Sequence, residues 1–167
     1  MQERSAILQT LSYSHQRGVE QYLLSARSAL AKLASISGLL DDVSLKRERG
    51  TFTRNLVFAD KQLSVWALVW APSSYTPIHD HHCSCCLTVL SGTIRETWYS
   101  AINQNTVTKI DEHYRRSGYV ASMMPSGPNI HQMANVGSSE AVSLHIYGYD
   151  HRNYASSMLH EYQPAVD

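Results

Sequence analysis

The first 37 residues place hydrophobic side chains three or four positions apart. Two groups of apolar residues show this spacing: Ile7, Leu8 and Leu11, followed by Tyr22, Leu23, Ala26, Leu30 and Leu33. Such spacing aligns apolar side chains along one face of an α-helix. Gly18 is expected to interrupt the pattern and Gly38 to end it, because glycine is a weak helix former that often follows the last helical residue. The pattern therefore predicts two helices within residues 1–40.

From Thr51 onward, short runs of β-branched and aromatic residues alternate with turn residues. This pattern is typical of β-strands. Eight runs fit it, at residues 52–58, 63–70, 87–90, 93–99, 106–110, 119–123, 130–134 and 141–147. Because the runs are too close together for helical crossovers, the strands are expected to pair antiparallel and to form a small barrel or jelly roll. Ser91-Gly92 and residues 135–138 have the composition of hairpin turns.

The length and the change of pattern indicate how the chain is organised. A chain of 167 residues is close to the usual size of one domain and can bury a hydrophobic core. We therefore expect a single domain over residues 1–167. It has a helical segment over residues 1–40, and residues 51–150 form the barrel core. The predicted fold class is mainly β, with two N-terminal α-helices.

Composition narrows the classes of partner. Lys plus Arg number 14 and Asp plus Glu also number 14, so no net charge attracts nucleic acid or a membrane surface. The first ten residues carry charge and lack the apolar core of a secretion signal. The most apolar stretch, residues 63–71, is far shorter than the ~20 residues of a transmembrane helix. We expect a small-molecule partner and no nucleic acid or membrane partner. The chain is expected to act as a monomer, with an oligomer as the alternative.

The segment at residues 79–86, with the sequence HDHHCSCC, gathers three of the nine histidines and all three cysteines. Clustered cysteines cannot staple a fold, which favours reduced thiols and a cytoplasmic location. On an extended strand side chains alternate, so His79 and His81 point to the same side. Cys83 and Cys85 join them if the strand continues unbroken. Two imidazoles inside a barrel need partners for their nitrogens, and a metal ion supplies one.

The spacing around this segment resembles the first motif of the cupin barrels. The H-x-H pair is followed by three residues, Cys85, six residues and a glycine, with Cys85 where a cupin usually has glutamate. The second cupin motif has a counterpart in Gly118, Pro125-Ser126-Gly127, His131 and Asn135. The resemblance implies that His131 lies opposite His79 and His81. A zinc ion held by the thiolates of Cys83 and Cys85 is the alternative, but it leaves His131 without a role.

A set of three histidines and no carboxylate has chemical consequences. Three neutral imidazoles leave a divalent ion at full charge and with open coordination positions. Such an ion suits an anionic substrate together with oxygen, whereas the common non-haem iron set has two histidines and one carboxylate. We therefore expect the metal to bind a thiolate or an enolate.

With this ligand set and its flanking motifs, the chain resembles the cysteine dioxygenases, cupins that oxidise a thiol to a sulfinic acid at a three-histidine iron centre. Four segments show the resemblance, in family order: residues 53–57, residues 79–92, His131 and residues 143–147. The resemblance implies that Fe(II) is held by His79, His81 and His131. It also implies that Arg54 pairs with the substrate carboxylate, which a guanidinium can grip with two hydrogen bonds.

Ser143, His145 and Tyr147 lie at alternate positions of one predicted strand. A hydroxyl, an imidazole and a phenol can therefore form a hydrogen-bonded chain on one face. From the residues alone, a satisfied core cluster is the preferred interpretation. The resemblance instead implies that Tyr147, oriented by His145 and Ser143, hydrogen-bonds near the oxygen and the substrate. Animal members have a cysteine at the position of Cys85 that forms a thioether with this tyrosine, so Cys85 and Tyr147 are candidates for that cross-link.

Two departures from the animal enzymes bear on the substrate. Phe52 stands where those enzymes have tyrosine, and Gly148-Tyr149 replaces their Ser-Pro-Pro segment. The second departure resembles bacterial thiol dioxygenases, some of which act on 3-mercaptopropionate. Arg54 favours L-cysteine, because the mercaptopropionate enzymes tend to have glutamine near that position.

The sequence therefore predicts a bacterial-type thiol dioxygenase that uses non-haem Fe(II) and O2 to oxidise L-cysteine to cysteine sulfinic acid. One alternative is a dioxygenase of another thiol acid, 3-mercaptopropionate or mercaptosuccinate. Others are a cupin enzyme that oxidises a diketone or isomerises a sugar, and a module that sequesters zinc or copper.

Overall fold

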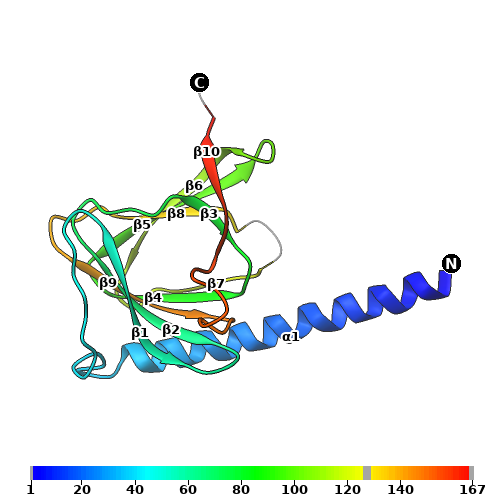
Figure 1. Cartoon of the computed structure of the whole chain (residues 1–167), viewed down its shortest axis with the longest axis horizontal. Helices are drawn as coiled ribbons and strands as arrows, with labels where there is room; N and C mark the ends of the chain where they lie inside the picture. The colour runs from blue at the N-terminus through cyan, green and yellow to red at the C-terminus, as the bar shows by residue number, and fades with distance from the viewer. Residues whose placement is uncertain (1, 126–128, 166–167) are drawn as a thin grey trace.

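One long helix and ten β-strands make up the described part of the chain, residues 2–125 and 129–165 of the computed structural model (Figure 1). Residues 126 and 127 of the second predicted motif lie outside these described residues. The elements follow in the order α1 (Gln2–Ala34), β1 (Phe52–Ala59), β2 (Ser64–Trp70), β3 (Ile78–His81), β4 (Cys85–Ser91), β5 (Thr93–Ala101), β6 (Thr106–Arg116), β7 (Val120–Met123), β8 (His131–Asn135), β9 (Ala141–Tyr147) and β10 (Met158–Pro164). All eight predicted strands occur, and β3 and β10 are additional.

Gly18 does not interrupt the helix, so the prediction of two N-terminal helices is wrong. A glycine inside a helix costs only about 1 kcal/mol relative to alanine. Burial of Leu23, Ala26 and Leu30 against the neighbouring sheet offsets that cost. Gly38, with a φ of 70°, lies in the turns beyond the end of α1. No helix among the described residues is long and apolar enough to cross a membrane.

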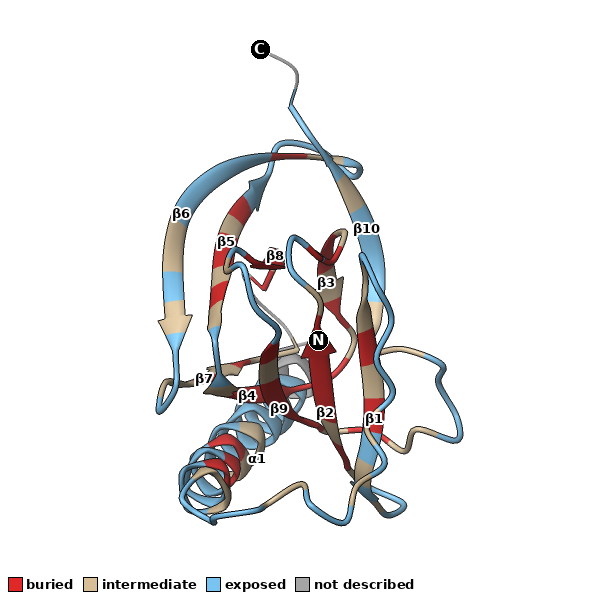
Figure 2. Cartoon of the chain, turned by 90° about the vertical axis from the view of Figure 1, so that its left-hand side faces the viewer, coloured by how far each residue is buried: buried red, intermediate tan, exposed pale blue. Residues whose placement is uncertain are grey.

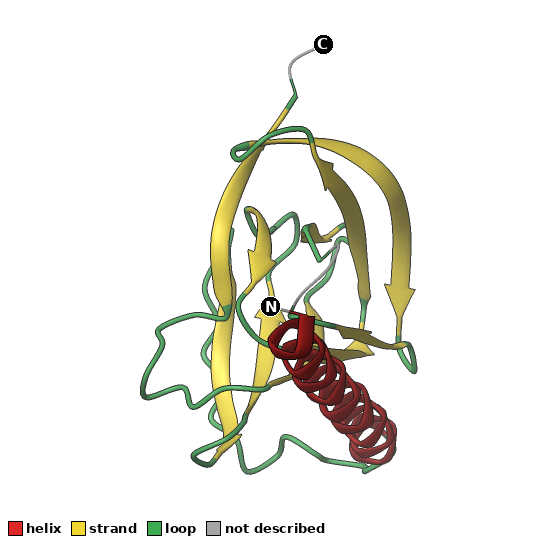
Figure 3. Ribbon diagram, turned by 90° about the vertical axis from the view of Figure 1, so that its right-hand side faces the viewer, coloured by secondary structure: helices red, strands yellow, loops and turns green. Residues whose placement is uncertain are grey.

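Helix α1 lies against the outer face of one sheet (Figure 3). This sheet has five strands in the order β1-β2-β9-β4-β7. Neighbouring strands in this sheet pair antiparallel, as predicted. Side chains alternate between its two faces. In β2, Val65 and Ala67 pack with the helix, whereas Leu68 and Trp70 belong to the cluster on the opposite, inner face.

The other five strands face the inner side of this sheet, in the order β10-β3-β8-β5-β6 (Figure 2). Strand β10 pairs antiparallel with β3 and, at Gln163 and Pro164, parallel with β6, which joins this group into a ring. Asp80 strengthens the first pairing by accepting hydrogen bonds from the His160 backbone N–H at 2.8 Å and the Tyr162 hydroxyl at 2.9 Å. The fold is therefore a mainly β jelly roll of two facing sheets, and the ten strands do not close into one barrel.

Most connections take the chain from one sheet to the other. Ser91-Gly92 joins β4 to β5, and the turn at residues 135–138 leads from β8 to β9, so neither closes the predicted hairpin. Gly92 has a φ of 78°, and a Cβ at this position would collide with Ala141, so the corner requires glycine. The HDHHCSCC segment makes the same kind of crossing, because β3 and β4 belong to opposite sheets. Consequently, the strand that carries His79 and His81 does not continue unbroken to Cys85.

Candidate metal centre

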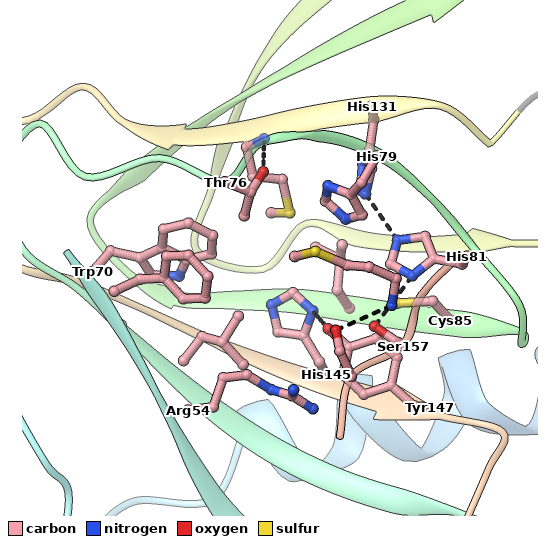
Figure 4. A pocket seen from close by; sticks show the side chains of 16 residues that line it. Arg54, Trp70, Thr76, His79, His81, Cys85, His131, His145, Tyr147 and Ser157 are labelled. Carbon is pink, nitrogen blue, oxygen red and sulfur yellow. Dashed lines mark hydrogen bonds between the residues drawn. The ribbon is translucent and has the colours of Figure 1, made fainter. Parts of the chain in front are cut away.

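Three buried histidines converge in the cavity between the two sheets (Figure 4). Strand β3 provides His79 and His81, and β8 provides His131, whose Cα is the cross-strand partner of His79. Their potential ligand atoms all lie within 4.8 Å of one another, and the residues are 2%, 3% and 1% exposed. Among the described residues, this is the group of three or more His, Cys, Asp or Glu that could hold a metal ion. The structure thus brings together the three histidines that the sequence singles out.

Hydrogen bonds at Nδ1 decide which nitrogen of two of these rings carries the proton. His79 Nδ1 lies 2.9 Å from the Pro77 carbonyl oxygen, and His131 Nδ1 lies 3.1 Å from Glu96 Oε1. A carbonyl oxygen and a carboxylate can only accept, so each ring donates from Nδ1, which leaves Nε2 as the nitrogen that can offer a lone pair. The orientation of both rings therefore leaves Nε2 as the metal-binding atom.

His81 completes the set. Its Nδ1 lies 3.2 Å from the Ser157 hydroxyl oxygen, and its Nε2 lies 3.0 Å from Nε2 of His131. Burial lowers the pKa of His79 to about 3 and the pKa of His81 well below its usual range. The rings of His79 and His81 are therefore neutral, and three buried imidazoles with ligand atoms within 4.8 Å of one another form a donor set that a divalent cation fits.

Glu96 is a part of this centre that the sequence analysis does not identify. Its carboxylate is fully buried and lies between His131 and Arg115, whose Nε donates to Glu96 Oε2 at 2.9 Å. Although burial opposes it, hydrogen bonds from His131 and Arg115 lower the pKa of Glu96, so the group is ionised. The available signal was a charged residue two positions after Ile94 on a predicted strand, on its inward face. A carboxylate behind a metal-binding histidine fixes the tautomer and makes the ring a stronger ligand.

Replacing Glu96 by Gln is expected to weaken Fe(II) binding by about 10- to 100-fold. The amide retains the shape of the side chain but removes the negative charge behind His131. Equilibrium competition with a chelator measures the dissociation constant. Glu112→Gln is the matched control, because Glu112 pairs with Lys109 at the surface of β6. Equal affinities of the two variants for iron would show that Glu96 does not support His131.

The cysteines do not join the histidine group. Cys83, Cys85 and Cys86 are buried free thiols, and Cys85 starts β4 in the opposite sheet. Burial raises the pKa of Cys83 to about 12 and that of Cys86 to about 11, so these thiols stay protonated at pH 7. Among the described residues, none of these thiols belongs to a group of side chains that could hold a metal ion, which argues against the zinc thiolate alternative. Cys85 instead is the cross-strand partner of Tyr147.

A buried chain of hydrogen bonds runs along the inner face of the helix-covered sheet. Trp70 Nε1 donates to Ser143 Oγ at 2.8 Å, Ser143 Oγ lies 2.7 Å from His145 Nε2, and Tyr147 Oη lies 3.2 Å from His145 Nδ1. The predicted trio of residues is therefore connected. Trp70 is a fourth member that the sequence analysis does not assign to the site.

The indole of Trp70 determines the direction of this chain, because an indole N–H can only donate. Ser143 accepts from Trp70 and so directs its own hydrogen to Nε2 of His145. Burial lowers the pKa of His145 to about 3, so the ring is neutral and carries its proton on Nδ1. That N–H donates to the Tyr147 oxygen. Because His145 donates to this oxygen, the hydroxyl hydrogen of Tyr147 is directed to another acceptor at the cavity, where Ser157 is within hydrogen-bonding reach.

Arg54, on β1, brings a positive charge to the same cavity. Its Nη1 donates to the Ala155 carbonyl at 3.0 Å and its Nη2 to the Tyr149 hydroxyl at 3.0 Å. The guanidinium also lies over the ring of Trp66, 4.5 Å from its centroid. The cavity has a volume of about 30 Å³, and one water molecule needs about 10–15 Å³ by the same measure. The site therefore suits a compact anionic ligand.

The family model for cysteine dioxygenase type I matches residues 44–164. A double-stranded β-helix protein from Klebsiella pneumoniae is 17% identical, with a TM-score of 0.55 over 73% of this chain and 95% of that chain. A protein from Thermus thermophilus is 14% identical, with a TM-score of 0.51 over 63% and 90%. A cupin domain from Bordetella pertussis matches at 12% identity and a TM-score of 0.45 over 61% and 97%. The first two matches show a shared fold.

Proposed function

Because the chain belongs to the cysteine dioxygenase type I family, we propose that it oxidises L-cysteine to cysteine sulfinic acid with O2 at a non-haem Fe(II) centre. The family and the histidine cluster together indicate a metal-dependent dioxygenase of the cupin class. The observation that supports the proposal most directly is the convergence of three buried histidines in a cavity that Arg54 also lines.

The chemistry of the donor set fits Fe(II). When bound, Fe(II) supplies open coordination positions and the redox capacity that lets a thiol react with O2. His79, His81 and His131 would hold it through Nε2, and the hydrogen bonds at their Nδ1 atoms keep the rings oriented. Because these ligands are neutral, the site favours an anionic thiolate over a neutral thiol. In the overall reaction the sulfur is oxidised, dioxygen is reduced and both oxygen atoms end on sulfur, so no further reductant is required.

The protein's own groups account for substrate binding. Among the described residues that line the cavity, Arg54 is the one with a guanidinium or ammonium group, and none has a carboxylate. A substrate carboxylate therefore has one charged partner, which can hold it with two hydrogen bonds. The small volume favours a short thiol such as L-cysteine over a longer one.

Tyr147 would act on the reacting atoms. Its hydroxyl hydrogen is not used by His145, because the chain from Trp70 through His145 already supplies a donor to its oxygen; Ser157 is its other hydrogen-bonding neighbour. Burial raises the pKa of Tyr147 well above its usual range, so the phenol keeps its proton. A fixed hydrogen-bond donor stabilises negative charge that develops on oxygen in the transition state.

The proposal is tested by loading the protein with Fe(II) without oxygen and then measuring O2 consumption. L-Cysteine, 3-mercaptopropionate and mercaptosuccinate are compared at matched concentrations, and the products are identified by mass spectrometry. We expect the highest kcat/KM with L-cysteine and a sulfinic acid as its product. Faster oxidation of one of the other thiols would reassign the substrate. Full iron content without oxidation of any thiol would rule out a thiol dioxygenase.

We also propose that Cys85 and Tyr147 form a thioether during turnover. They are direct cross-strand partners of β4 and β9, and both are buried. The new C–S bond replaces one S–H and one C–H bond, and O2 accepts the electrons and protons released. Mass spectrometry of digested protein is expected to find the two peptides joined, with two hydrogen atoms lost, after incubation with Fe(II), L-cysteine and O2. Cys86→Ala should form the same product, since Cys86 faces α1. Recovery of only separate peptides after many turnovers would contradict the cross-link.

A further inference from the structure

The residues immediately after β9 lie beside Arg54. Gly148 donates its backbone N–H to the Ser84 carbonyl at 2.9 Å, and a Cβ at this position would collide with the Ser84 hydroxyl. Glycine thus permits a close approach of the two segments. The next residue, Tyr149, is 6% exposed, and its hydroxyl accepts the hydrogen bond from Nη2 of Arg54. Tyr149, which is not among the predicted site residues, therefore contacts Arg54, the one guanidinium among the described residues that line the cavity.

The guanidinium of Arg54 is held at several points. The Ala155 carbonyl and the Tyr149 hydroxyl each accept one hydrogen bond from its two terminal nitrogens. Trp66 covers one face of the group, and the Tyr147 ring lies 5.8 Å away. Both terminal nitrogens are fixed to the protein, so the group has little freedom to rotate. Such restraint lowers the entropy that a ligand must remove when it binds.

One nitrogen of Arg54 is buried without a partner among the described residues. Its Nε is buried and has no hydrogen-bond partner within the described protein. A guanidinium has five N–H donors, of which two are taken by Ala155 and Tyr149. A buried donor without a partner is unfavourable, so an acceptor is expected to complete it. A carboxylate in the cavity would satisfy this nitrogen together with a remaining N–H of Nη2.

We propose that Tyr149 is a positioning residue that fixes Arg54 in the orientation that binds a carboxylate, and so makes the site selective for thiols that carry one. Phe52, two positions before Arg54 on β1, cannot do this. It has no hydroxyl and stacks on Trp70 with ring centroids 5.0 Å apart. The hydroxyl that accepts the hydrogen bond from Arg54 instead belongs to Tyr149, just after β9. The identity of the substrate in this inference rests on the proposed function. The binding measurement described below does not require turnover.

Kinetics of Tyr149→Phe separate this role from a structural one. The variant keeps the ring and its packing and loses the hydroxyl. Loss of a hydrogen bond to a charged group predicts about a tenfold rise in KM for L-cysteine and 3-mercaptopropionate, with kcat within about twofold. Cysteamine, a thiol without a carboxylate, should show the same KM with both proteins. The matched control is Tyr154→Phe, whose exposed ring lies 5.9 Å from that of Tyr149. Unchanged KM for L-cysteine, or an equal rise for cysteamine, would overturn the proposal.

A binding measurement makes the test independent of turnover. Isothermal titration of 3-mercaptopropionate into iron-loaded protein without oxygen is expected to show about a tenfold higher Kd for Tyr149→Phe than for the wild type. Arg54→Lys should weaken binding in both backgrounds, and adding Tyr149→Phe to it should cost nothing further, because Tyr149 acts through Arg54. If the losses of binding free energy from the two substitutions added up in the double variant, Tyr149 would not act through Arg54. If the wild type oxidises no thiol, the proposed function fails, while the two Kd values still decide the role of Tyr149.

Discussion

Replacing His131 by Ala is expected to abolish stoichiometric Fe(II) binding and, with it, oxygen consumption. The substitution removes one of three ligands, and the two that remain both come from the short strand β3. Even the loss of a partner behind a ligand costs about 10- to 100-fold in metal affinity, so loss of a ligand itself should exceed about 100-fold. Metal analysis of the protein after anaerobic loading and desalting measures the effect.

Two controls separate this effect from unfolding. His113→Ala removes a histidine that pairs with Asp111 at the surface of β6, and it should bind a full equivalent of iron. Near-ultraviolet circular dichroism should show native packing in both variants, because Glu96 keeps its partner Arg115 when His131 is removed. A folded His131→Ala protein with a full equivalent of iron would mean that the three histidines are not the metal site.

Replacing Tyr147 by Phe is expected to lower kcat about 10²- to 10³-fold, the usual effect of removing one hydrogen-bond donor from a reacting oxygen. Iron affinity should be unchanged, because Tyr147 belongs to β9 in the other sheet and is not among the grouped ligands. The ring and its packing are retained, so only the hydroxyl is lost. Steady-state kinetics with L-cysteine and metal analysis of the same preparation measure the two quantities.

Tyr114→Phe is the matched control for this substitution. Tyr114 is an exposed tyrosine on β6 whose hydroxyl bonds only to Glu112 among described residues, so its removal should leave kcat within about twofold. A Tyr147→Phe protein as active as wild type would remove the tyrosine from the proposed reaction. Parallel loss of iron and activity would instead make it a structural residue of the metal centre.

The sequence was sufficient to predict the eight strands and the composition of the histidine group. Strand assignment depends on local alternation, and so does the placing of His79 and His81 on one side of a strand. Strand β10 and the bounds of β3 were not among the eight predicted runs, for a local reason. Only Ile78 is apolar in β3, and β10 is largely exposed, so neither shows the alternation of a half-buried strand.

Other parts of the site depend on residues far apart in the chain. Glu96 lies 35 positions before His131, and Tyr149 lies 95 positions after Arg54. No short pattern connects such pairs, because their contacts arise only when the two sheets face each other. The same holds for Trp70, whose place in the hydrogen-bonded chain follows from the register of β2 against β9.

The sequence by itself determined the mainly β class, the placing of His79 and His81 on one side of a strand and the alternation of Ser143, His145 and Tyr147, because each follows from local alternation along strands. The resemblance to the second cupin motif added His131. The tertiary structure decided that α1 is one helix and that Cys85 lies in the sheet opposite the histidines. It also decided that Glu96 hydrogen-bonds to His131 and that Tyr149 hydrogen-bonds to Arg54. The physical reason is that packing energy can override a local signal such as Gly18, and only packing brings polar partners from distant strands into a common, water-excluded interior.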